Sequence, residues 1–182
     1  MKKIFLVITA GTLSLAACNS DNKSTTSDDK KMSDEKMSSS TEDKEERNKK
    51  IIMESVEAFN THNADETLKN VASETIDYGD GSMPAVKNVD SIKAGMKSYM
   101  NAFPDVKGEN LKYIADGDYV VVWGDWSGTF KNDFMGMKAT NKLFKYKEAD
   151  IFKLNEDGKI IEHRSVQSSM TMMNMVGAKM PK

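Results

Sequence analysis

The pattern of hydrophobic and polar residues divides the chain into three parts: an apolar N-terminal run, a long polar segment and a periodic C-terminal region. In the periodic region, apolar residues at helical spacing predict a first helix over residues 51–59, with its end at 60–63. A short second helix is expected from residue 64 or 65 to Val71. A third helix, with Asp90 as its N-cap, is expected to end before Phe103-Pro104.

Alternating apolar residues predict strands in the remainder of this region. The expected strands cover residues 75–78, 110–115, 119–130, 140–154 and 159–167. Gly-containing turns separate them at 79–81, 116–118 and 155–158, and a closing helix is expected at 169–176. Helices followed by a run of strands indicate the α+β class. We expect the helices to pack on a curved antiparallel sheet and to enclose a cone-shaped cavity.

The N-terminal run has the layout of a secretory signal peptide. Lys2 and Lys3 precede an apolar stretch over residues 4–15, and two small residues, Ala16-Ala17, precede Cys18. This order resembles the lipobox of bacterial lipoproteins, in which the cysteine is acylated and the signal is cut before it. We therefore expect a signal peptide at 1–17, a lipid on Cys18 and attachment to a membrane of the cell envelope. That membrane would be the outer membrane, or face the periplasm, if the host is Gram-negative. The alternative is a chance cysteine after an ordinary signal.

The segment that follows is almost free of large apolar residues. Residues 19–47 consist mainly of Ser, Thr, Asp, Glu, Lys and Asn, and such a stretch buries too little apolar surface to offset its ordering entropy. We expect residues 18–47 to be a lipidated cysteine with a disordered tether. One domain would then cover 48–178, and 179–182 would be a tail.

Composition excludes several kinds of chemistry. Cys18 is the only cysteine, so a lipidated chain has no thiol for a disulfide, for catalysis or for zinc. The net charge of −2 gives no reason to bind nucleic acid. Methionines crowd the C-terminus at 170, 172, 173 and 175, and could ligate Cu(I), but no His or Cys completes a set, so core packing is the expected role. No phosphate loop or nucleophile elbow is visible. The sequence predicts no metal and no cofactor.

Several short signatures occur in a characteristic order. They are Phe59-Asn60-Thr61-His62-Asn63, Phe103-Pro104-Asp105, Asp150-Ile151-Phe152, Asp157-Gly158-Lys159-Ile160-Ile161-Glu162-His163 and Met175-Val176-Gly177. Over residues 48–177 the chain resembles the SnoaL-like polyketide cyclase and ester cyclase family, within the nuclear-transport-factor-2-like superfamily. The resemblance implies a cystatin-like cone whose cavity holds acidic and histidine side chains for acid–base steps.

After the Glu-His pair, the family often carries a tryptophan and aspartates, whereas this chain has Arg164, Ser165 and Ser168. The departure argues against cyclase activity. Together with the expected lipid on Cys18, it leads us to expect a membrane-anchored domain that binds a small, largely apolar ligand in its cavity. One alternative is a cyclase- or isomerase-type enzyme that uses acid–base catalysis. The second is an interaction module that forms a homodimer through its sheet, which the superfamily often does.

The candidate catalytic residues are His163, Asp150 and Glu148. His163 is either a general base or a hydrogen-bonded strand histidine. Glu148 and Asp150 alternate with aromatic residues, and the sequence leaves open whether that strand face points inward. Asp77 and Asp80 either take part in acid–base work or form a turn, and His62 is expected at a helix end without a catalytic role. The expected pocket walls are Phe59, Tyr78, Trp123, Trp126, Phe144, Tyr146 and Met173.

Overall fold

The structure, a computed structural model, describes residues 28–179, with side chains described from residue 40 onward. Cys18 and the predicted signal peptide lie outside the described residues. The elements in chain order are α1 (Asp28–Asn60), α2 (Ala64–Thr67), β1 (Val71–Asp77), α3 (Val89–Ala102), β2 (Lys107–Asp116), β3 (Tyr119–Thr129), β4 (Leu143–Leu154), β5 (Ile160–Ser165) and α4 (Ser169–Met175).

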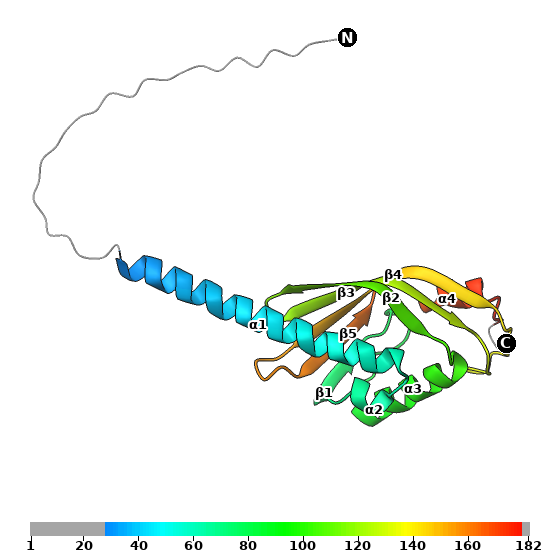
Figure 1. Ribbon diagram of the computed structural model, residues 1–182. Helices are drawn as coiled ribbons and strands as arrows, with labels where there is room; N and C mark the ends of the chain where they lie inside the picture. The colour runs from blue at the N-terminus through cyan, green and yellow to red at the C-terminus, as the bar shows by residue number, and fades with distance from the viewer. Residues whose placement is uncertain (1–27, 180–182) are drawn as a thin grey trace, which may run out of the picture.

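The five strands form one curved sheet in the order β1-β5-β4-β3-β2 (Figure 1). The predicted α+β fold, with helices packed on such a sheet, is confirmed. The expectation of a purely antiparallel sheet is wrong at one edge, because β1 runs parallel to β5. Alternation identifies a strand but not its partner. Here α3 lies between β1 and β2 in the chain, and β1 joins the sheet at the edge opposite β2.

Several element boundaries differ from the prediction, most clearly around α2, β1 and α3. The second helix ends at Thr67 and β1 begins at Val71, four residues before the expected strand. The N-cap of α3 is Asn88 rather than Asp90, and its Oδ1 accepts hydrogen bonds from the amides of Asp90 (2.9 Å) and Ser91 (3.1 Å). Asn is as good an N-cap as Asp, and the carboxylate of Asp90 lies favourably in the first turn.

Helix α1 is far longer than the sequence pattern predicts, since it begins at Asp28. It lies across β2 and β3 and extends beyond the sheet (Figure 1). The expectation of a disordered tether is therefore wrong for residues 28–47. Eleven of its 20 residues are Lys, Glu, Met or Arg, which favour helix even where no apolar stripe exists.

The last part of that segment contacts the domain. Glu45 accepts a hydrogen bond from the amide of Gly117 (2.9 Å), and Arg47 donates to the carbonyl oxygen of Glu156 (2.7 Å). The fully buried Asn48 donates to the Gly117 carbonyl oxygen (3.1 Å), and Lys44 forms an ion pair with Asp118. The folded unit thus begins near Lys44, earlier than the expected boundary at residue 48.

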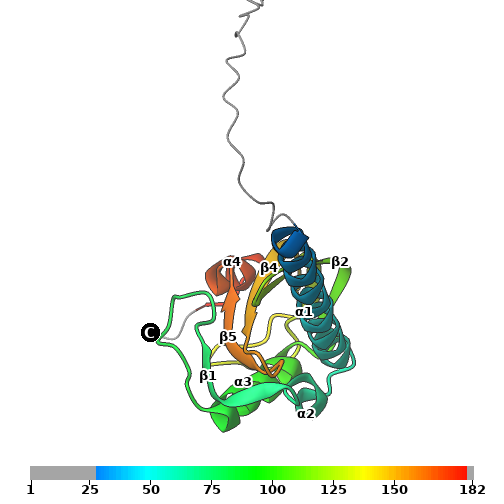
Figure 2. The ribbon, with the colours of Figure 1, turned by 90° about the vertical axis from the view of Figure 1, so that its left-hand side faces the viewer.

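The core lies between the helices and the concave face of the sheet. The end view in Figure 2 shows the sheet curling around an interior that α1, α2 and α3 complete. Phe103, at the end of α3, packs on Phe130 and Phe144 with ring centroids 5.2 and 5.5 Å apart. Burial of three such rings contributes several kcal/mol to folding.

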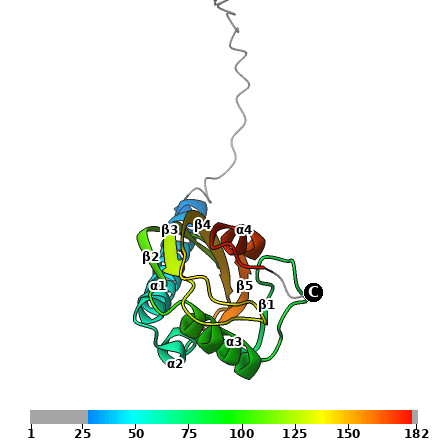
Figure 3. The same cartoon turned by 90° about the vertical axis from the view of Figure 1, so that its right-hand side faces the viewer.

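The segment between β3 and β4 closes the other end of this interior (Figure 3). The amide of Lys131 donates to the carbonyl oxygen of Ala102, at the end of α3 (2.9 Å). The hydroxyl of Thr140 donates to the carbonyl oxygen of Val176, at the end of α4 (2.6 Å). Among the described helices, none is both long enough and apolar enough to cross a bilayer.

Candidate functional site

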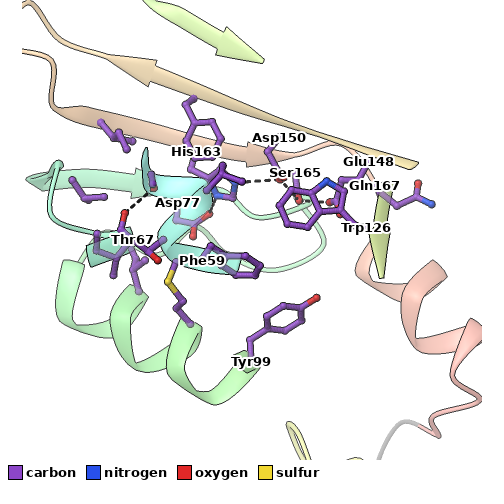
Figure 4. A pocket seen from close by; sticks show the side chains of 18 of the residues that line it. Phe59, Thr67, Asp77, Tyr99, Trp126, Glu148, Asp150, His163, Ser165 and Gln167 are labelled. Atoms are coloured by element: carbon purple, nitrogen blue, oxygen red, sulfur yellow. Dashed lines mark hydrogen bonds and ion pairs between the residues drawn. The ribbon is translucent and has the colours of Figure 1, made fainter. Parts of the chain in front are cut away.

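A cavity of about 270 Å³ lies between the helices and the concave face of the sheet (Figure 4). One side of its wall is apolar and comes mainly from the helices and β1. This side includes Val56, Phe59, Leu68, Val71, Ile92 and Met96. The other side carries polar groups from β1, β4, β5 and α3. These groups are Asp77, Tyr99, Tyr146, Glu148, Asp150, His163 and Ser165.

The inward face of the sheet is the one that carries the carboxylates. On β3, Val120, Val122 and Trp126 are buried, whereas Tyr119 and Trp123 are exposed. On β4, the residues that share a face with the buried Phe144 include Glu148 and Asp150, and both line the cavity. The structure therefore decides the question that alternation left open, in favour of the inward orientation.

His163 lies between two carboxylates. Its Nδ1 is 2.9 Å from Asp77 Oδ1, and its Nε2 is 3.4 Å from Asp150 Oδ1. Burial opposes a charge on this ring, but the hydrogen bonds to Asp150 and Asp77 outweigh burial and raise the pKa of His163 to about 10. As an imidazolium, the ring donates from both nitrogens. A group that holds its proton in this way is a poor general base at neutral pH.

Asp77 is the ionised partner of that ring. Burial opposes its charge, yet the hydrogen bond from His163 and the amide of Gly79 (2.9 Å) hold the pKa of its carboxyl below the usual range. Asp77 also anchors the neighbouring loop, because its backbone exchanges two hydrogen bonds with Val86, each 2.8 Å long. Asp77 and His163 are thus the rigid, charged end of the site.

Glu148 has the opposite behaviour. Burial and the charge of Asp150 raise the pKa of Glu148 to about 7, although hydrogen bonds with Ser165 and Tyr146 act in the other direction. At neutral pH this carboxyl therefore exists in both protonation states. That is the property expected of a group that accepts and returns a proton.

The cavity also contains donors that keep their protons. Burial and the nearby carboxylates raise the pKa of both Tyr99 and Tyr146, so their hydroxyls stay neutral. The Tyr99 hydroxyl lies 3.4 Å from the sulfur of Met172. The indole Nε1 of Trp126 is buried and has no hydrogen-bond partner among the described residues.

Of the seven residues expected as pocket walls, Phe59, Trp126 and Tyr146 line the cavity. Tyr78 does not, because its ring packs under the Arg164 guanidinium at 3.6 Å. Trp123 faces outward, where Lys112 and Lys147 lie over its ring. Phe144 and Met173 are buried in the core, and Met172 lines the cavity instead. Strand alternation identifies the residues that share a face, but it does not tell which face points inward. Neither strand nor helical periodicity tells how deeply a side chain on that face is buried.

The remaining sequence candidates have structural roles. His62 Nε2 lies 3.1 Å from the carbonyl oxygen of Val106. Asp80 accepts hydrogen bonds from the amides of Ser82 (2.9 Å) and Ser169 (2.6 Å), and so ties its turn to the start of α4. Ser168 caps that helix through the amide of Met170 (3.2 Å).

The sequence did not reveal three contributions to the site. Tyr99 lines the cavity, Asp77 is the partner of His163, and Ser165 forms hydrogen bonds with Glu148 and Asp150. The signal for Ser165 and His163 was their shared parity on one strand, two residues apart. Across the described residues, no group of His, Cys, Asp and Glu side chains is arranged to hold a metal ion. Met172 and Met173 are buried whereas Met170 and Met175 are exposed, so the methionines do not converge.

Comparison with known proteins supports the fold and gives the family. AclR from Streptomyces galilaeus, a proposed hydroxylase, is 23% identical with a TM-score of 0.63, over 75% of this chain and 99% of AclR. A proposed SnoaL-like polyketide cyclase from Jannaschia sp. CCS1 is 18% identical with a TM-score of 0.67, over 75% of this chain and 96% of the other. A proposed polyketide cyclase from Xanthomonas campestris pv. campestris is 14% identical with a TM-score of 0.67, over 74% of this chain and 99% of the other.

At this level of identity the three structures show a shared fold and nothing finer. A search of curated proteins found no match. The family model for the SnoaL-like polyketide cyclases, however, matches residues 50–175, which is more than half of the chain. The match spans α1 to α4 and includes the whole cavity. This chain therefore belongs to the SnoaL-like polyketide cyclase family.

Proposed function

We propose that the domain binds a small, largely apolar carbonyl compound in its cavity and transfers a proton to or from it. The observation that carries the proposal is a half-buried carboxyl, Glu148, whose pKa lies near 7 in an otherwise largely apolar pocket. A catalytic group works best when its pKa lies near the operating pH. The volume of about 270 Å³ suits a small ligand.

Each polar group has a role in this scheme. Ionised Glu148 removes a proton from the carbon next to the carbonyl, and the electron pair moves to the carbonyl oxygen. The neutral hydroxyl of Tyr146 or Tyr99 donates to the developing oxyanion. Protonated Glu148 then returns the proton to the oxygen or to another carbon. Alternatively, the enolate carbon attacks a second carbonyl of the same molecule, and the oxygen of that carbonyl takes the displaced electron pair and the proton from Glu148. The His163 imidazolium, between Asp77 and Asp150, positions this end of the site.

The second candidate is the function that the sequence favoured, ligand binding without cyclase activity. It is supported by Ser165 and Ser168 at positions where the family resemblance implies acids. Ser168 is engaged as the cap of α4. In this second case, the apolar wall and the unpartnered indole of Trp126 would serve only to hold the ligand.

Hydrogen–deuterium exchange separates the two functions. The probe is 1-tetralone, a small, largely apolar ketone, and proton NMR in D₂O at neutral pH follows the loss of its C2 protons. We expect the protein to accelerate the loss, and Glu148→Gln to reduce the acceleration by about 10²-fold or more. Glu74→Gln, a change at an exposed strand residue, is the matched control. Binding of 1-tetralone with no acceleration would favour the binding-only function.

We also propose that Cys18 carries lipid and holds the domain at a membrane of the cell envelope. The order of positive, apolar and small residues before Cys18 supports this. Acyl chains stabilise attachment by about 0.8 kcal/mol for each buried CH₂ group. The long helix α1 would then separate the cavity from the anchored end.

A homodimer through the outer sheet face is a further proposal. Ile114, Tyr119 and Trp123 are exposed on β2 and β3 and give this face an apolar centre. Sedimentation equilibrium of the Cys18→Ser chain and of a variant that also carries Trp123→Glu tests it. A dimer that persists unchanged in the variant would place the interface elsewhere.

A further inference from the structure

Ser165 lies between the two cavity carboxylates. Its Oγ is 2.5 Å from Glu148 Oε1 and 2.9 Å from Asp150 Oδ1. The register of the sheet creates this position, because Asp150 and Ser165 are directly paired across β4 and β5. Glu148 is two residues from Asp150 and so projects from the same face of β4. Figure 4 shows the three side chains together at one end of the cavity.

The number of protons available at Ser165 limits which of these hydrogen bonds can form. A serine hydroxyl has one proton to donate, and an ionised carboxylate can only accept. Ser165 can therefore donate to one of the two carboxyl groups. In the other contact, a lone pair of Ser165 Oγ would face a lone pair of the carboxyl oxygen unless that carboxyl group carries a proton. Both contacts are satisfied when one of the two carboxyl groups is protonated.

We propose that Ser165 is a hydrogen-bond switch that serves both protonation states of Glu148. When Glu148 is neutral, its O–H donates to Ser165 Oγ, and the Ser165 hydroxyl donates to Asp150. When Glu148 gives its proton to a ligand, the Ser165 hydroxyl turns and donates to the new carboxylate. One proton leaves the site and no covalent bond to Ser165 breaks. This inference deepens the proposed function and rests on it for the role of the ligand.

The other side chains around the junction favour this assignment of the proton. Asp150 Oδ1 already faces the Nε2 of His163, which is a donor in the imidazolium form, so Asp150 is the better held anion. Within residues 40–179, whose side chains the structure describes, no lysine or arginine lines the cavity. Among the described residues, the titratable groups that line the cavity together with Glu148 are Tyr146 and Asp150 on β4, His163 on β5, Tyr99 on α3 and Asp77 on β1.

Residue 165 is one of the positions at which the family resemblance implied the loss of an acidic side chain. Where the resemblance implies an acid near residue 165, a serine here replaces a third negative charge with a neutral group that can both donate and accept. A third carboxylate beside Glu148 and Asp150 would raise the cost of ionising any of them. Ser165 is therefore a positioning residue for Glu148 rather than the remnant of a lost catalytic group.

The test requires no ligand and no activity. The Cys18→Ser chain, labelled with ¹³C at the glutamate side-chain carboxyl, is titrated by NMR, and Glu148→Gln assigns the Glu148 signal. We expect wild-type Glu148 to titrate near pH 7. Ser165→Ala removes the donor to the ionised form and moves the midpoint upward by about one pH unit. Ser165→Thr, which keeps the hydroxyl, is expected to restore the wild-type midpoint.

A matched control is available at the surface. Ser82→Ala removes a hydroxyl that donates to the single carboxylate of Asp80, and it should leave the Glu148 midpoint unchanged. An unchanged midpoint in Ser165→Ala, with native circular dichroism, would overturn the switch. The proposed function fails separately, through absent exchange of 1-tetralone protons in a protein whose Glu148 still titrates near pH 7.

Discussion

Asp77 and His163 join two strands that are far apart in the chain, with Asp77 Oδ1 2.9 Å from His163 Nδ1. They are direct partners in the parallel ladder of β1 and β5, so backbone register and side-chain contact reinforce each other. The same histidine faces Asp150 on its other side. The imidazolium therefore connects three strands and sets the position of the charged end of the cavity.

This relationship predicts a pH dependence of stability. The pKa of His163 is raised from its ordinary value of 6.5 to about 10 on folding, so its contribution is complete below pH 6.5 and is lost as pH rises toward 10. The pKa of Asp77 is lowered from 3.8, so its contribution is lost as pH falls below about 4. Urea unfolding of the wild type should show a decrease in free energy between pH 6.5 and 10.

His163→Gln keeps the size and polarity of the side chain but does not titrate. The variant should be less stable than the wild type at pH 6, and the difference between the two should shrink toward pH 10. A constant difference between the two proteins across this range would contradict the ion pairs. The raised pKa of Glu148 also lowers the free energy of unfolding between pH 4.5 and 7. This contribution of Glu148 must therefore be subtracted from both stability curves before they are compared.

The unpartnered indole predicts a specific effect on binding. Trp126→Phe keeps an aromatic ring in the wall but removes the Nε1–H, which has no partner among the described residues. The Nε1 atom is buried, so a ligand oxygen reaches it only when the ring turns toward the cavity. An oxygen that then accepts from this donor contributes about 1 kcal/mol, so calorimetry should show about fivefold weaker binding of 1-tetralone. Trp123→Phe, on the outer face and 38% exposed, is the matched control and should bind as the wild type does. Equal affinity of all three proteins would remove Trp126 from the binding site.

The N-terminal boundary of the folded unit can be tested by truncation. A chain that begins at residue 40 retains Lys44, Glu45, Arg47 and Asn48, and should match the stability of a chain without the signal peptide. A chain that begins at residue 49 loses the partners of the Gly117 amide and carbonyl. It should be less stable by about 2–4 kcal/mol in urea unfolding, because buried polar groups lose their hydrogen bonds. Equal stability of the two truncated chains would restore the boundary near residue 48.

The lipid anchor predicts the behaviour of a single substitution. Cys18→Ser removes the acylated thiol, so the folded domain should appear in the soluble fraction when membranes of the expressing bacterium are sedimented. The wild type should sediment with the membranes and gain the mass of its acyl chains in mass spectrometry. Wild-type chain of unmodified mass in the soluble fraction would contradict the anchor.

The sequence by itself determined the class of the fold and the family. Helical spacing around Val56, the Val- and Trp-rich run of β3, alternation in β4 and Gly turns such as that at Gly117 are local properties, and they predicted most elements correctly. The same reasoning failed for the first part of α1, residues 28–47, because a helical segment without an apolar stripe has no periodic signal. It placed Trp123 in the pocket because alternation does not tell which strand face points inward, and Phe144 because periodicity does not report depth.

Only the tertiary structure decided which polar groups form a site. Asp77, Asp150, His163 and Ser165 lie on three strands, and their meeting depends on the ladder registers that pair Asp77 with His163 and Asp150 with Ser165. A shift of one residue in either register would turn half of these side chains away from the cavity. Register arises from the packing of the whole sheet against α1 and α3, which no local pattern encodes. The chemistry of Glu148 follows from the same packing, because burial beside Asp150 is what brings its pKa to about 7.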